Sequence, residues 1–168
     1  MERIFDFDKA ERKILEDIHQ CLVSIRQIAS RNVASSRQGV EVLRELRQAV
    51  YEDINQIQHE EMALRAARSL QENDFSSQKL DWYWNPRQTG DASEPDLIGM
   101  KDNKIVVSAE ITTSEEPKGT IDKRMSDTLA KLNAMQGERY YFVRTESMEN
   151  RARTKIEKAG FKIIIRNI

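Results

Sequence analysis

The sequence predicts an α/β (α+β) protein in which a long N-terminal helical hairpin or arm precedes a mixed central sheet flanked by helices. Two observations support this fold class. Apolar residues recur at helical spacing through residues 9–73, and after residue 75 short apolar segments alternate with amphipathic helical patterns. We therefore expect two parts, a helical arm over residues 1–75 and an α/β core over residues 76–168.

The arm is expected to contain two helices. The first carries one apolar face, formed by Leu15, Ile18, Leu22, Ile25 and Ala29. Asp8 is its expected N-cap, and residues 29–39 lack a strong apolar stripe and should break the helix. A second stripe over residues 40–72 would extend about 50 Å as a single helix. Such a helix cannot bury its stripe on a small domain alone, so we expect it to pack on the first helix, on a second copy in a homodimer, or on both.

The core is expected to follow the order β, β-hairpin, α, β, α, β, with its central strands buried. The expected strands cover residues 81–85, 97–100, 104–113, 140–143 and 161–165. Asp102 and Asn103 form the turn of the hairpin. One helix of about 18 residues opens at Pro117, and another begins at Ser147 and ends before Gly160.

Composition excludes several classes of protein. With 39% hydrophobic residues, six Gly and three Pro, the chain is not collagen-like, low-complexity or a disulfide scaffold. Its apolar runs are too short to span a membrane, no leader opens the chain, and the single Cys21 has no internal disulfide partner, so we expect a cytoplasmic protein. The net charge of −1 indicates no nucleic-acid binding by itself, and any such function must depend on a site.

Two acidic residues on neighbouring expected strands form the candidate site. Asp96 precedes the strand over residues 97–100, and Glu110 lies inside a strand that is apolar on both faces. A carboxylate there is costly unless it is paired or binds a cation. A three-residue loop would pair Asp96 with Glu110 on one face. A two-residue turn would put them on opposite faces unless a bulge restored the match.

Two close carboxylates repel each other, and oxygen ligands without a nearby His or Cys pair favour Mg²⁺ or Mn²⁺. Pro95 and Asp96, the apolar run, and Glu110, Ile111 and Thr112 resemble the motif of the PD-(D/E)XK, or restriction-endonuclease-like, nuclease superfamily. The resemblance covers residues 76–168. It implies a restriction-endonuclease-like sheet and Mg²⁺-dependent hydrolysis of DNA phosphodiester bonds, for example in restriction or defence, with the metal on Asp96 and Glu110.

Thr112 stands where the family has its catalytic lysine, which orients or activates water. Lys123, on the following helix, is the first candidate to replace that lysine, and Lys118 is the second. If neither reaches the site, the core is a catalytically degenerate module that binds nucleic acid without cleaving it. A third interpretation is a coiled-coil interaction protein in which the helices are the functional part.

Other polar and aromatic residues are expected to be structural. Glu60 and Glu61 occur where members of the family place an extra acidic residue, but both are expected to be surface charges, and His59 a surface histidine. Trp82 and Trp84 should pack in the core. Basic residues expected on ordinary surface are Arg124, Lys131, Arg144, Arg151, Arg153 and Lys155.

Overall fold

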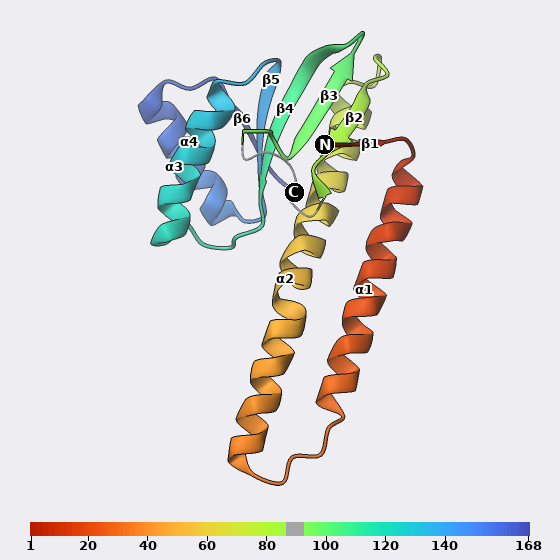
Figure 1. Ribbon diagram of the computed structural model, residues 1–168. Helices are drawn as coiled ribbons and strands as arrows, with labels where there is room; N and C mark the ends of the chain where they lie inside the picture. Colours follow the sequence, from red (N-terminus) through yellow and green to blue (C-terminus); the bar gives the residue numbers. More distant parts are fainter. Residues whose placement is uncertain (87–92) are drawn as a thin grey trace.

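The computed structural model describes residues 1–86 and 93–168, and its centre is a mixed six-stranded sheet (Figure 1). The strands, in spatial order, are β1 (Glu2–Ile4), β2 (Asp81–Trp84), β3 (Leu97–Lys101), β4 (Lys104–Thr112), β5 (Glu138–Val143) and β6 (Ile164–Asn167). Strands β1 to β4 are antiparallel to one another. Strand β5 pairs in parallel with β4, and β6 pairs in parallel with β5. The predicted fold class and element order are confirmed. The edge strand β1 was not predicted.

Two pairs of helices accompany the sheet. Helices α1 (Phe7–Ala29) and α2 (Ser36–Ser69) form a hairpin whose far end extends beyond the sheet (Figure 1), and α2 continues into a π-helical turn, η1 (Leu70–Asp74). Helices α3 (Thr120–Asn133) and α4 (Glu146–Ala159) follow β4 and β5 and cover the other face. The described residues contain no helix long and apolar enough to cross a membrane.

Each face of the sheet has its own hydrophobic cluster. Met62 in the last third of α2 and Leu70 in η1 pack with Trp82 and Trp84 on one face, as predicted for the tryptophans. Tyr141 and the inner sides of α3 and α4 form the cluster on the other face. The predicted arm is therefore attached to the core at its start and at its end: β1 pairs with β2 as a strand of the sheet, and the end of α2 packs against the sheet.

The helices start one to four residues away from the predicted positions. Asp6, not Asp8, caps α1, because its carboxylate accepts the backbone N–H groups of Asp8 and Lys9. Helix α3 begins at Thr120 rather than Pro117, since the preceding residues form a turn in which Gly119 has a φ of 57°. Gly160 ends α4 with a φ of 66°, as predicted.

The apolar face of α1 is rotated from the predicted one. Ile14, Cys21 and Ile28 are its buried residues, whereas Leu15 and Leu22 are exposed. The prediction selected a neighbouring stripe because apolar residues occupy more than one face of this helix. The hairpin therefore carries exposed apolar side chains that its own packing does not cover.

Candidate metal centre

A tight turn joins the two strands that carry the acidic pair. Asp102 and Asn103 have φ angles of 49° and 61°, and the flanking residues pair directly across them. Positive φ at both central residues belongs to the type I′ hairpin turn, which Asn and Asp tolerate better than most residues. If this register continued without interruption, Asp96 and Glu110 would point to opposite faces.

A β-bulge in β4 changes that register. The pairing shifts between Gly99 and Met100, and Val106 has no partner among the described residues of β3. Continuing the shifted register by one step places Asp96 opposite Glu110 on the same face of the sheet. The two-residue turn and the compensating bulge, left open by the sequence, therefore occur together.

Glu110 is a buried carboxyl group with a perturbed pKa. Its pKa is raised from 4.5 to about 7: burial is the largest cause, the negative charge of Asp96 adds to it, and the Lys131 ammonium opposes both. Lys131 Nζ lies 2.7 Å from Glu110 Oε1, at ion-pair distance. Oε1 itself is buried and accepts no aligned hydrogen bond from the part of the chain that the structure describes.

Asp96 is held by contacts from two other elements. Its Oδ2 accepts the backbone N–H of Ile111 at 2.8 Å and lies 3.3 Å from Nε2 of His59 on α2. Burial favours neutral His59, but Asp96, Glu110 and Glu60 together raise the histidine pKa above 6.5. The end of α2 thus brings a histidine to the acidic pair, and it places the carboxyl group of Glu60 close enough to that histidine to affect its pKa.

The expected surface positions of His59 and Glu60 are wrong. His59 is 6% exposed and Glu60 is 1% exposed, because this part of α2 lies against the sheet. Glu61 is exposed and paired with Arg65, as expected for a surface charge. The sequence signal that was missed is the set of small residues that follows, Ala63, Ala66 and Ala67, which lets α2 approach the sheet closely.

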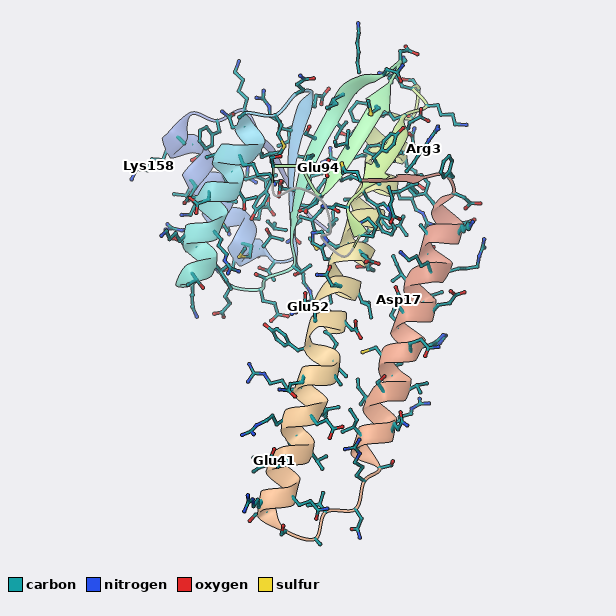
Figure 2. The ribbon with its side chains drawn as sticks, in the orientation of Figure 1. Arg3, Asp17, Glu41, Glu52, Glu94 and Lys158 are labelled. Atoms are coloured by element: carbon teal, nitrogen blue, oxygen red, sulfur yellow. The ribbon has the colours of Figure 1, made fainter. Side chains whose placement is uncertain are left out.

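The lysine that the structure brings to Glu110 is Lys131, which was expected on a solvated helix face. Its ammonium also donates to the backbone carbonyl oxygen of Glu94, at 2.8 Å (Glu94 is labelled in Figure 2). Lys123 lies two helical turns earlier on α3, with its side chain exposed. Lys118 is exposed too and pairs with Glu116. Within the described chain, neither of these two lysines forms an ion pair with Asp96 or Glu110.

Thr112 follows Glu110 by two residues and shares its face of β4. Its hydroxyl oxygen lies 2.8 Å from the phenol oxygen of Tyr141, the β5 residue paired with Glu110. Burial is the main reason that the pKa of Tyr141 is raised, to about 12, so the phenol stays protonated at neutral pH. Thr112 is therefore a neutral hydrogen-bonding group beside the acidic pair.

The remaining basic candidates are ordinary surface residues, as predicted. Their carboxylate partners lie nearby: Arg144 with Glu115, Arg151 and Lys155 with Asp122, and Arg153 with Glu149.

The acidic pair fits a hard divalent cation by its donor chemistry. Within residues 1–86 and 93–168, no group of three or more His, Cys, Asp or Glu side chains is arranged to hold a metal ion. Mg²⁺ needs only one or two protein carboxylates, because waters and substrate phosphates complete its octahedral shell. The buried Glu110 Oε1 is a suitable ligand atom, and the Lys131 ammonium, 2.7 Å away, is the cation that lies beside it in this structure. Comparison with protein-family models, curated proteins and solved structures found no match to this chain.

Proposed function

We propose that this protein is a Mg²⁺- or Mn²⁺-dependent nuclease that hydrolyses DNA phosphodiester bonds, of the kind found in restriction or defence. The observation that carries the proposal is the convergence of Asp96 and Glu110 on one face of the sheet. Their mutual repulsion and burial make a site in which a divalent cation is favourable. A cytoplasmic location accords with the unpaired Cys21.

Each residue of the proposed site has a separate task. Asp96 and Glu110 would hold the ion, which when bound polarises the phosphate and lowers the pKa of its water. Lys131 would take the role of the family's catalytic lysine, whose position in this chain holds Thr112. Its ammonium already lies beside Glu110 and would orient water or balance negative charge there. His59 holds Asp96 in position through the 3.3 Å contact.

A second candidate is a nucleic-acid-binding module without catalysis. Two observations favour it: Thr112 is not a lysine, and Glu110 and Asp96 each have a basic neighbour, in Lys131 and His59. This alternative predicts salt-dependent DNA binding with no turnover in any metal.

We also propose that the hairpin joins two copies of the chain. Beyond the sheet, in the region marked by Asp17, Glu41 and Glu52 in Figure 2, the hairpin has no third element against it. Its large exposed apolar side chains are Leu15, Leu22, Val23, Val40, Leu43, Tyr51 and Ile54. A homodimer would cover them and pair two catalytic sites on one duplex. If residues 1–75 bind a different protein and no metal binds, the coiled-coil interaction protein is the better description.

The test of the nuclease proposal is cleavage of plasmid DNA in Mg²⁺ or Mn²⁺. We expect Asp96→Asn and Glu110→Gln each to lower the rate at least about a hundredfold, since each removes one of two charged ligands. Glu61→Gln is the matched control, because Glu61 is an exposed acidic residue on α2 and should leave the rate unchanged. Equal cleavage by wild type and both site variants would overturn the assignment.

The lysine assignment has its own comparison. Lys131→Met should reduce cleavage about a hundredfold, whereas Lys123→Met should leave it near wild type. A loss confined to Lys123→Met would return the catalytic role to the residue first expected from the sequence.

A further inference from the structure

A small polar cavity lies next to the acidic pair, at the carboxyl end of β4. Its volume is about 260 Å³, it is partly open to solvent, and residues of α2, β4, β5 and α3 line it. Five hydroxyl-bearing residues line it: Thr112, Thr113, Ser114, Thr128 and Tyr141. Drug-sized ligands occupy cavities of about 300–1,000 Å³, so this one suits a single polar group rather than a whole nucleotide.

The cavity has one fully charged cation on its wall. Arg124, on the first turns of α3, makes no ion pair with any residue in 1–86 or 93–168. Other arginines of the same region, such as Arg151, are held by carboxylates. An arginine without an ion pair in the described chain, lining the same cavity as several hydroxyl groups, makes a favourable environment for a phosphate, which accepts hydrogen bonds from both kinds of donor.

The beginning of α3 adds to this environment. No side chain of the described residues caps the first amides of the helix, which starts at Thr120. Helix N-termini carry partial positive charge and favour anions. Asp122 in this first turn does not cancel the effect of Arg124, because its carboxylate is bound to Arg151 on α4.

The cavity and the acidic pair are adjacent parts of one surface. Thr112 lies two residues beyond Glu110 on the same face of β4, a rise of roughly 6.6 Å along the strand. His59 lines the cavity and also contacts Asp96. The distance along the strand is comparable to that between neighbouring phosphates of a nucleic-acid strand.

We propose that the cavity formed by Thr112, Arg124 and Thr128 binds the phosphate next to the one that is cleaved. This inference rests on the nuclease function proposed above and adds the direction in which the substrate strand runs from the metal site. Arg124 supplies the charge, and the hydroxyl groups of β4 and α3 fix the position of the phosphate oxygens.

The test is built so that it does not require cleavage. In the full chain carrying Glu110→Gln, with EDTA present, binding of a short fluorescein-labelled single-stranded DNA is measured by anisotropy over a range of salt concentrations. Arg124→Gln should weaken binding at least about tenfold and reduce the slope of log affinity against log salt by about 0.7, the loss of one phosphate contact. Thr128→Val, which keeps the side-chain shape, should weaken binding several-fold with no change in slope.

Arg153→Gln is the matched control, because Arg153 is an exposed arginine on α4 that pairs only with Glu149 among the described residues. Inorganic phosphate and deoxythymidine monophosphate are titrated separately as competitors.

Equal affinity and slope for Arg124→Gln and Arg153→Gln would overturn the proposal. Binding of inorganic phosphate that depends on Arg124, with DNA binding that does not, would also overturn it, since the cavity would then be a small-anion site. If Arg124 proves necessary while wild type cleaves nothing, the phosphate site stands and the nuclease function falls.

Discussion

Asp96 and Glu110 share a face of the sheet because β4 contains one residue, Val106, that β3 does not match. The tight turn at Asp102 and Asn103 alone would have separated the two carboxyl groups. The bulge is therefore as important to the candidate site as the acidic residues themselves. It also stands next to Gly137, whose position gives a direct test.

The bulge should be sensitive to a side chain at Gly137. A Cβ added there would lie 2.4 Å from the carbonyl oxygen of Val106, and the φ of Gly137 is 77°. We expect Gly137→Ala to combine a positive-φ cost of about 1–2 kcal/mol with a packing cost of about 1–3 kcal/mol. Urea denaturation measures the sum.

Gly160→Ala is the control for that experiment. Gly160 also has a positive φ, of 66°, but an added Cβ meets nothing within 4 Å. It should therefore show only the backbone cost. Equal destabilisation by the two alanines would mean that the contact with Val106 does not constrain the bulge.

Glu110 should make the folded protein less stable as the pH rises. Its pKa is raised from 4.5 to about 7, so ionisation costs the folded state more than the unfolded state. The cost is absent below pH 4.5, grows between 4.5 and about 7, and is complete above that range. Glu110→Gln should thus raise the free energy of unfolding near pH 8, by up to about 3 kcal/mol, and change it little near pH 5.

Chemical denaturation of wild type and Glu110→Gln at several pH values checks this prediction. The difference between the two proteins is the informative quantity, because His59, with its own raised pKa, also makes wild-type stability fall as pH rises. A difference that is the same near pH 5 and near pH 8 would contradict a buried, ionising Glu110.

Divalent metal should stabilise the wild-type protein against heat. Mn²⁺ at about a hundred times its Kd would add about 3 kcal/mol, and EDTA should reverse the shift in Tm. The shift should be larger near pH 8 than near pH 6, since a proton on Glu110 competes with the ion. Asp96→Asn should abolish it, whereas Glu61→Gln should retain it. An equal shift in Asp96→Asn would place the ion elsewhere.

The hairpin surface should control association of the chain. Leu43 and Tyr51 are 66% and 58% exposed on α2. Changing both to Glu should convert a dimer to a monomer in sedimentation velocity while leaving the chain folded, because neither side chain belongs to the buried core. A wild-type protein that sediments as a monomer at high concentration would exclude the homodimer.

Sequence patterns alone predict most of the helices and strands and the two acidic residues of the candidate site. Periodicity located the helices and the strands of the core, because these patterns reflect neighbours a few residues apart. Glu110 stood out since a carboxylate inside an apolar strand needs a partner. The helix caps of α1 and α3 were less predictable, as several nearby residues can satisfy the same backbone groups.

The other groups of the site come together only through strand pairing and helix packing. The bulge at Val106 has no sequence signature, and it depends on pairing between two strands. His59 and Lys131 approach Asp96 and Glu110 from α2 and α3, far away in the chain, after both helices have packed on the sheet. The spacing of apolar residues predicts which face of a helix or strand is buried. It does not predict which polar side chains of different elements come together, because that depends on how the elements pack.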